Sequence, residues 1–591
     1  MRPENVIVAT FTVKAANEMK QRLSDLVGAD VGRRLVLGTF HSIARRYLIK
    51  YGHLIGLRPG WGIADAADTK AICQVRRMIL DFESTELTSS FLQRIIKRRK
   101  MGDSIDPKKL QSRISHFKAR NLSPRANEQP VYTSTKPMPQ GTAQKQNDIA
   151  NEEFVEMYDD YHAMLEASNI LDYDDLLLRC LEMIRQFPEC VSNIEMVLID
   201  EFQDTNVVQY ELMKHLAWKN KRVTIVGDPD QSIYGFRAAE IGNLKRMRQL
   251  YPETLVVNLE ENYRSSASIL SAALEVIIQD KARPDKPLVA THAIGPSPVL
   301  RRVPTPASEA TWIVGEIKRM QALTANMVKF SGIAILVRSS PLTRVIETAL
   351  AREGVPYKMV GGTRFFDRAE IKVIIDYLRV LQNPANNDAV ARVVNVPSRK
   401  VGETTVKALL EEAERRKKTL WELMCKGVRG DMPWGVKVST QAEKGLGSFT
   451  AMMLGIVKKL DEVEAETTLA DLLKTLLDKI GYEDHVQRVY PEDFDGRWAN
   501  VEEVISQARE TSVVVEDDFL PEIEGVEQHI SLNTPRLALD NFLANVALVN
   551  ERKAEELEDP CGEVTISTIH AAKGMWQYDL TVLLMLTLCR T

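Results

Sequence analysis

Short apolar runs, each closed by a polar or glycine-containing turn, recur along this chain. Most of their positions are aliphatic or β-branched, which is typical of parallel strands that are buried on both faces. The runs lie at 6–9, 35–37, 196–199, 223–226, 333–337 and 564–567. Between them apolar residues recur at helical spacing, as in 15–26 and 371–381. The alternation predicts an α/β fold of doubly wound parallel sheets, in which ligands bind beyond the carboxyl ends of the strands.

Two long stretches interrupt this alternation. Residues 61–171 contain charged, helix-like segments and a run at 121–150 rich in Pro, Ser, Thr, Gln and Asn, which buries too little apolar surface to fold. Residues 395–560 are rich in Glu, Lys and Leu and have a mostly helical pattern. We therefore expect two α/β cores, each carrying an inserted, mainly helical domain, with a disordered loop at 121–150.

Composition limits the classes of function. The 591 residues carry a formal net charge of -4, so a nucleic-acid site must be a local groove rather than a globally basic surface. The 6 cysteines lack CxxC spacing, which excludes a disulfide scaffold or a zinc ribbon and fits a reducing compartment. The longest late apolar run, 580–588, is too short to span a bilayer, so we expect no membrane role.

An acidic pair follows one of the predicted strands. The run at 196–199 delivers Asp200 and Glu201 to the carboxyl end of a strand. In hydrolysis of a nucleoside triphosphate, the first carboxylate can hold Mg²⁺ and the second can polarise the attacking water. A strand followed by an ordinary turn gives the same pattern, so the pair alone leaves both interpretations open.

A second strand, at 223–226, leads into a Gly/Pro turn and Gln231, whose amide can contact a γ-phosphate or its water. The next residues place Tyr234 and Phe236 beside Arg237. Aromatic faces next to a cation suit the stacking of single-stranded bases and the neutralisation of a phosphate. The alternative is a buried aromatic cluster with a surface arginine.

A third element, ENYRSS at 261–266, places the ring of Tyr263 next to the guanidinium of Arg264. This pair can stack on a purine and stabilise charge on a transferring phosphoryl group. A surface Arg–Asp pair is the alternative interpretation.

In this order and spacing, DEFQDT, GDPDQSIYGFRAA and NYRSS resemble motifs II, III and IV of the UvrD/Rep/PcrA-type superfamily 1 helicases. Other segments resemble further parts of the same family, among them motifs Ia and V: TFTVKAANEM, GTFHS, LDYDDLL, GGTRFFDRAEIKVIIDYLRVLQNP and TISTIHAAKG. The likeness covers nearly the whole chain. Within the family, the segment FLANVALV and the low-complexity insertion are similar to fungal anti-recombination helicases.

The resemblance implies two RecA-like cores and 3′-to-5′ movement on single-stranded DNA, driven by hydrolysis of ATP with Mg²⁺. It implies that Asp200 helps to hold Mg²⁺, that Glu201 is the catalytic base and that Gln231 senses the γ-phosphate. Tyr263 would stack on adenine and Arg264 would act as an arginine finger. Thr10, Phe11, Thr12, His41, Tyr234, Phe236 and His570 would line the DNA track. The alternatives stay open that His41 caps a helix and that Phe11 and Phe236 pack in a core.

The expected domains follow from the motifs and the interruptions. The first core occupies 1–60 and 172–285 around the insertion 61–171, and the second occupies 286–394 and 561–591 around the insertion 395–560. By resemblance the partners are single-stranded DNA, junctions of single and double strands, and recombination or replication proteins. A nuclear location is expected on the same ground.

The chain departs from the family in one major respect. No G-x-x-x-x-G-K-[ST] occurs in it, and the motif VI arginine is not found. We therefore expect both cores to be incomplete and the chain to be a truncated, inactive piece of a helicase. The alternative is an ATP-independent remnant that binds single-stranded DNA or a partner. Retention of Glu201, Gln231 and Arg264 favours motor ancestry, because a pure binder needs no water activator.

Overall fold

The computed structural model describes most of the chain and divides it into two compact units. Unit 1 consists of Met1–Glu201, Thr205–Val226 and Phe366–Asn550, and unit 2 of Phe202–Asp204, Gly227–Phe365 and Glu551–Thr591. Within these, the described residues are 1–64, 107–122, 151–233, 239–240, 242–281, 283, 286–325, 327–339, 342–360, 366, 368–460, 468–491, 493–514, 520, 523, 525–526, 535–548 and 562–573.

Unit 1 contains a four-stranded sheet of order β2-β1-β5-β6, in which every pairing is parallel. The strands are β1 (Val6–Thr10), β2 (Val36–Thr39), β5 (Met196–Ile199) and β6 (Val223–Ile225). Thr10 lies opposite Thr39, and Ile199 lies opposite both Ala9 and Ile225, so the carboxyl ends of all four strands share one edge. The four apolar runs predicted in this part of the chain are confirmed as strands.

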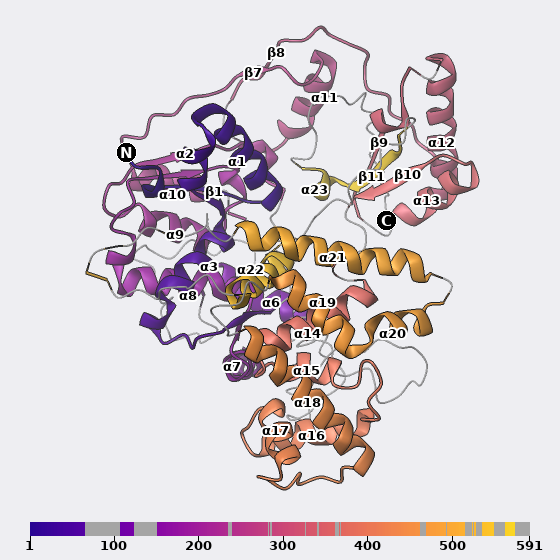
Figure 1. Cartoon of the computed structure of the whole chain (residues 1–591). Helices are drawn as coiled ribbons and strands as arrows, with labels where there is room; N and C mark the ends of the chain where they lie inside the picture. Colours follow the sequence, from indigo (N-terminus) through magenta and orange to yellow (C-terminus); the bar gives the residue numbers. More distant parts are fainter. Residues whose placement is uncertain are drawn as a thin grey trace. The chain divides into compact units, whose positions relative to one another are not determined.

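Helices alternate with or follow these strands in the chain of unit 1. Among them are α1 (Val13–Val27), α2 (Ala29–Arg34), α3 (Phe40–Tyr51), α8 (Tyr173–Gln186) and α9 (Val207–Leu216), and α1 and α3 contact the sheet. Helix α1, which contains the predicted segment 15–26, begins where the Thr12 side chain accepts a hydrogen bond from the Ala15 N–H (3.2 Å). Val8, Ala16 and Leu37 form a small buried cluster between α1 and the sheet, and α3 packs on α8 (Figure 1).

The first insertion is described at its ends and in two helices. Strands β3 (Gly62–Ile63) and β4 (Ile170–Leu171) pair in parallel and close its base. Helices α6 (Pro107–Ala119) and α7 (Asn151–Ala167) belong to it. The Lys118 ammonium, at the end of α6, is completely buried between Asp172 (2.6 Å) and Asp175 (2.7 Å) at the start of α8. Residues 123–150, most of the predicted disordered loop, lie outside the described residues.

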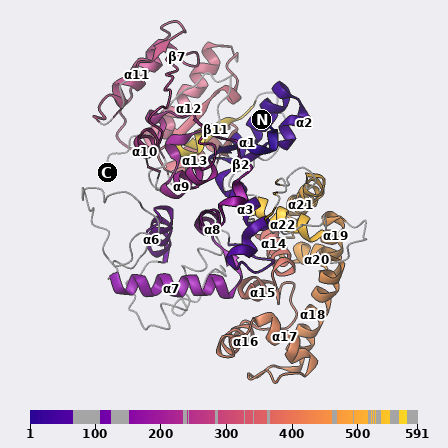
Figure 2. The ribbon, with the colours of Figure 1, turned by 90° about the vertical axis from the view of Figure 1, so that its left-hand side faces the viewer.

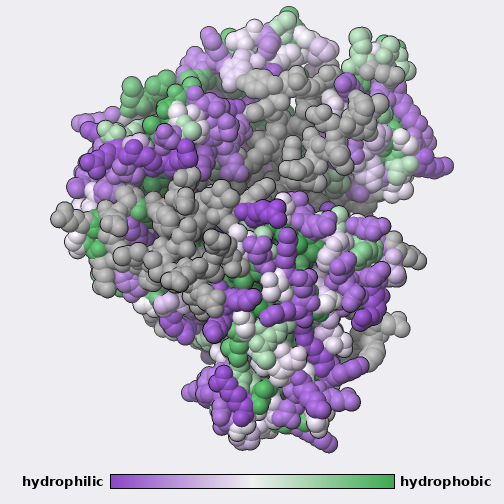
Figure 3. Space-filling model, viewed as in Figure 1, coloured by the Kyte–Doolittle hydropathy of each residue, from purple (hydrophilic) through white to green (hydrophobic). Residues whose placement is uncertain are grey.

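The remainder of unit 1 is helical. Its helices are α14 (Ala369–Gln382), α15 (Asn387–Val393), α16 (Glu403–Arg415), α17 (Leu420–Arg429), α18 (Thr440–Leu460), α19 (Leu469–Ile480), α20 (Tyr482–Val489), α21 (Phe494–Val514) and α22 (Pro535–Leu548). Figures 1 and 2 agree that α16, α17 and α18 lie side by side. Hydrophilic residues predominate on the face of these helices shown in Figure 3. The prediction of a mostly helical segment after residue 395 is confirmed for the described residues.

Unit 2 contains a three-stranded parallel sheet of order β10-β11-β9, formed by β9 (Ala334–Val337), β10 (Tyr357–Val360) and β11 (Val564–Thr568). Strands β7 (Glu261–Asn262) and β8 (Val289–Ala290) form a separate parallel pair. The helices are α10 (Gly242–Leu250), α11 (Ala267–Ile277), α12 (Pro306–Leu323), α13 (Thr343–Arg352) and α23 (Ile569–Ala572). Runs 333–337 and 564–567 are confirmed as strands, whereas β10 was not predicted because Lys358 interrupts its apolar residues.

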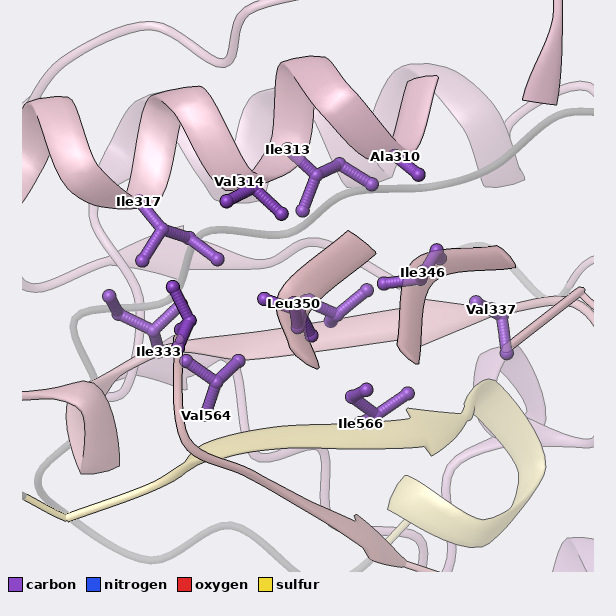
Figure 4. Packing of buried hydrophobic residues seen from close by; sticks show 12 residues of the cluster. Ala310, Ile313, Val314, Ile317, Ile333, Val337, Ile346, Leu350, Val564 and Ile566 are labelled. Carbon is purple, nitrogen blue, oxygen red and sulfur yellow. The ribbon is translucent and has the colours of Figure 1, made fainter. Parts of the chain in front are cut away.

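The core of unit 2 forms where α12 and α13 cover the three-stranded sheet. Ile313, Val314 and Ile317 of α12 face Ile333, which precedes β9, and Val564 and Ile566 of β11 (Figure 4). Spacing of three and four residues places these α12 side chains on one helical face. An α/β fold with a parallel sheet of three or more strands in each unit is thus confirmed.

One boundary between the two units falls between Phe365 and Phe366. The sequence predicts that this part of the second core extends to residue 394. The predicted domain limits stay predictions. No helix within the described ranges combines the length and the apolar character that crossing a bilayer needs.

Candidate functional site

The acidic pair lies at the carboxyl edge of the sheet in unit 1. The Asp200 N–H donates to the Ala9 carbonyl (3.0 Å), which extends the β5–β1 ladder by one residue. Glu201 then has a φ of 52°, in the left-handed region that a non-glycine residue rarely adopts. Such backbone strain concentrates at functional sites, where the surrounding structure holds it. The strand and the turn together fix the backbone positions from which the Asp200 and Glu201 side chains project.

The electrostatics of Asp200 fit a cation. Burial raises the pKa of its carboxyl, and the charge of Glu201 raises it further, against a hydrogen bond from the Glu201 backbone. A carboxylate that water solvates poorly gains most from a nearby positive charge. Oxygen donors of this kind are the ligands that Mg²⁺ prefers, and Mg²⁺ usually retains waters and substrate phosphates besides one or two carboxylates. Among the described residues, no cluster of three or more His, Cys, Asp or Glu could hold a metal by itself, so the pair would supply part of a shell.

Several of the predicted DNA-track residues share this edge. Thr10 ends β1 and is fully buried, and its hydroxyl has no hydrogen-bond partner within the described part of the chain. Phe11 is half-buried, and Thr12 is exposed and caps α1. His41 lies in the first turn of α3, half-buried and edge-on to Tyr173, with ring centroids 5.7 Å apart.

The cap of α3 is not His41. Thr39 holds that position, because its hydroxyl accepts the Ser42 N–H (3.2 Å). The alternative interpretation of His41 as a helix cap is therefore wrong. Its role as a DNA contact stays a prediction.

In unit 2, Gln231 ends a short 3-10 helix, Pro229–Gln231. Its side-chain nitrogen donates to Asp228 Oδ2 (2.8 Å). Asp228 also forms an ion pair with Lys286, and Asp230 binds Arg283 through two hydrogen bonds of 2.9 and 3.0 Å. Burial opposes ionisation of Asp228, but hydrogen bonds from Lys286 and Gln231 outweigh it and keep its pKa below the usual range.

A close backbone approach joins this turn to the segment after the acidic pair. The Asp228 N–H donates to Gln203 Oε1 (2.9 Å). A Cβ at Gly227 would lie 2.5 Å from the same oxygen, so only glycine fits there without displacing Gln203. Ser232 Oγ adds a hydrogen bond to the Gln203 carbonyl (3.2 Å). The turn that carries Gln231 is therefore fixed on residues 202–204.

Tyr263 and Arg264 follow β7 in a side-chain-stabilised turn. Asn262 Oδ1 accepts the N–H groups of Arg264 (3.2 Å) and Ser265 (2.9 Å), which is the hydrogen bonding of an Asx turn. Tyr263 is 66% exposed, and Arg264 is exposed. Both are accessible to a ligand from the surface of unit 2.

His570 lies half-buried in α23, directly after β11. Lys573 follows this helix, and its ammonium lies 2.5 Å from Asp204 Oδ2 and 2.6 Å from the Gln231 carbonyl oxygen. Sequence reasoning did not find this link. The residues are 369 and 342 positions apart, and no local pattern pairs them.

The structure thus brings the predicted residues into separate groups. Asp200, Glu201, Thr10 and His41 lie at one sheet edge of unit 1. Gln231 is joined to the α23 segment in unit 2. Tyr234, Phe236 and Arg237 lie outside the described residues. The chemical role of each residue stays a prediction.

Comparisons with known proteins cover nearly the whole chain. The family model "UvrD/REP helicase N-terminal domain" matches residues 1–252, and "UvrD-like helicase C-terminal domain" matches residues 257–587. The ATP-dependent DNA helicase srs2 of Schizosaccharomyces pombe is 39% identical over 97% of this chain and 61% of its own length. The ATP-dependent DNA helicase PcrA is 30% identical over 97% of this chain in both Leuconostoc citreum and Staphylococcus epidermidis, covering 69% and 70% of those proteins.

Proposed function

Because this chain belongs to the UvrD-like helicase family, we propose that it forms the motor part of a DNA helicase that hydrolyses ATP to move 3′ to 5′ along single-stranded DNA. The observation that carries the proposal is the acidic pair at the shared carboxyl edge of the unit 1 sheet. Ligands of open parallel sheets bind beyond this edge, and Thr10 and His41 lie along it.

The proposed chemistry assigns one task to each group. Asp200 would hold Mg²⁺, whose role is to neutralise charge on the phosphates. The Glu201 carboxylate accepts a proton from the attacking water. Gln231 contacts the γ-phosphate or that water. Tyr263 stacks on the adenine ring, and Arg264 stabilises negative charge on the transferring group.

The substrate follows from the family and from the proposed track. Single-stranded DNA would pass along Thr10, Phe11, Thr12, His41 and His570, with Tyr234, Phe236 and Arg237 as further contacts. We propose junctions of single and double strands as the natural substrates, recombination or replication proteins as partners, and the nucleus as the location. The relatives srs2 and PcrA are named ATP-dependent DNA helicases, which supports DNA as the substrate.

A second candidate function is binding without turnover. The 591 residues contain no G-x-x-x-x-G-K-[ST]. A loop of that kind cradles phosphates with its backbone N–H groups and a lysine, and provides much of the affinity and charge stabilisation in phosphoryl transfer. We therefore expect little ATP turnover from these residues alone. In this second candidate function, the chain binds single-stranded DNA without hydrolysing ATP.

One experiment separates the two candidates. ATP turnover is measured with and without oligo(dT), for the chain alone and for the chain joined to a strand and loop that carry G-x-x-x-x-G-K-[ST]. We expect turnover that depends on DNA only in the joined form. Glu201→Gln should lower it by roughly 10²-fold or more while Mg²⁺–nucleotide binding persists.

The matched control is Glu253→Gln, a change of an exposed carboxylate in unit 2, which should leave turnover unchanged. A joined chain that binds oligo(dT) but never hydrolyses ATP supports the binding function instead. Turnover that survives Glu201→Gln contradicts the assigned base.

A further inference from the structure

We propose that Lys573 is a positioning residue that transmits the state of the DNA track to the segment bearing Gln231. The proposal rests on the proposed function. It starts from a contact within unit 2, where the Lys573 ammonium reaches both the Asp204 carboxylate (2.5 Å) and the Gln231 carbonyl oxygen (2.6 Å). One ammonium group therefore joins two segments of unit 2: 202–204, which follows the acidic pair in sequence, and 229–231, which carries Gln231.

Burial makes the contact with Asp204 strong. The Asp204 side chain is 1% exposed and that of Lys573 is 11% exposed. A buried carboxylate without a cation is costly, because it has left water without compensation. Separation of the two charges is consequently costly, so a shift of one segment favours a shift of the other. In an ion pair at the surface, by contrast, water would solvate each charge after separation, so the pair would couple the two segments only weakly.

The second contact of Lys573 connects it to Gln231 itself. Lys573 binds the backbone carbonyl of Gln231, while Asp228 binds its side-chain amide. Lys573 thus supplies the side-chain contact to the backbone carbonyl of Gln231. Gln203 holds the turn on both sides of Gln231, through the Asp228 N–H and the Ser232 hydroxyl, so a displacement of Lys573 acts on the Gln231 carbonyl between these two contacts.

The other end of the link is the α23 segment. Lys573 follows α23 (Ile569–Ala572) at once, and His570, a proposed DNA contact, lies three positions before it. A helical turn moves as one body, so a force on His570 reaches Lys573 without intervening loops. DNA in the track would in this way fix the turn that carries Gln231.

The test measures hydrogen exchange of backbone amides in the full chain, with and without a saturating concentration of oligo(dT) for each variant. In the wild type we expect oligo(dT) to slow exchange at 228–233 by about fivefold or more. Lys573→Met should abolish this response. Lys573→Arg, which keeps a cation and its donors, should retain most of it. Lys281→Met, a change of an exposed lysine in unit 2, is the matched control and should respond as the wild type does.

A double variant controls for the possibility that Lys573→Met loses the response only because the chain misfolds. The pair Lys573→Met with Asp204→Asn removes both charges and leaves no unpaired buried carboxylate, so it should fold and still lose the response. If this double variant retains the wild-type response, the proposal is overturned. A wild type that binds oligo(dT) but shows no change at 228–233 also overturns it and leaves the proposed function standing. A wild type that does not bind oligo(dT) overturns both.

Discussion

The side-chain amide of Gln231 donates a hydrogen bond to Asp228, with 2.8 Å between the nitrogen and the carboxylate oxygen. The other oxygen of Asp228 pairs with Lys286. This bond uses one of the two N–H donors of the amide, so the side-chain carbonyl oxygen and the second N–H are the groups that can face a ligand. The oxygen can accept from the attacking water, whereas the second N–H can donate to a phosphate oxygen.

The first prediction concerns this orientation. In the joined, active form, Asp228→Ala should lower turnover roughly tenfold, because Gln231 loses the acceptor that holds its amide. Asp228→Asn keeps an acceptor oxygen and should cost less. In a Gln231→Ala background, Asp228→Ala should have no further effect if Asp228 acts only through Gln231. Additive losses in the double variant would refute the relationship.

The second prediction uses the left-handed backbone of Glu201, with its φ of 52°. Glu201→Gly should leave the free energy of unfolding unchanged or slightly higher, since relief of about 1 kcal/mol of strain offsets the entropy that glycine adds to the unfolded chain. Glu201→Val should lower it by roughly 1–2 kcal/mol, because a β-branched residue tolerates this region poorly. Urea unfolding measures both. Equal stability of the two variants would show that the turn relaxes at no cost.

Local patterns predicted the strands and helices that are apolar along their length. Run 196–199 coincides with β5, and the helical segment 371–381 lies inside α14. Buried parallel strands need such runs, and helices with one apolar face need their spacing, so the sequence carries both signals directly. Strand β10 has a lysine among its four residues and gives no comparable signal.

The candidate site was predictable where short motifs carry the chemistry, as with Asp200 and Glu201. The ion pair of Lys573 with Asp204 was not, because it joins residues 369 positions apart through the fold. The buried Lys118, paired with Asp172 over 54 positions, is a similar case. Periodicity reports which face of an element is apolar, but it holds no information on which buried charges meet.

The third prediction concerns pH and the start of α8. Burial, together with the charge of Asp172, raises the pKa of Asp174 to about 7 and that of Asp175 to about 6. Ser115 of α6 donates to Asp174 (2.6 Å) and opposes the shift. The folded chain therefore binds more protons here than the unfolded chain between about pH 4 and pH 7. The stability from these carboxyls is full below about pH 4 and is lost as the pH rises toward 7.

Buried histidines act in the opposite direction. Burial, together with the charge of Lys118, lowers the pKa of His162 to about 3, and burial lowers that of His215 to about 4. Asp174→Asn isolates the effect of this carboxyl, because an amide does not titrate. The wild type loses the stability that this carboxyl contributes as the pH increases from about 5 to about 7, so the free energy of unfolding of Asp174→Asn minus that of the wild type should rise over this range. Urea unfolding at several pH values measures this difference. The exposed Asp484→Asn is the control and should parallel the wild type, and a flat difference for Asp174→Asn would contradict the assignment.

The last prediction concerns Lys118 itself, which is completely buried and lies 2.6 Å from Asp172 and 2.7 Å from Asp175. Lys118→Met should lower the free energy of unfolding by about 3–5 kcal/mol, because it leaves buried carboxylates without a cation. Adding Asp172→Asn and Asp175→Asn removes those charges and should recover much of the loss. The control is Lys318→Met, which breaks an exposed pair with Glu353 and should cost less than about 1 kcal/mol. Equal losses for Lys118→Met and Lys318→Met would mean that water reaches the buried cluster, and the attachment of α6 to α8 would then need another cause.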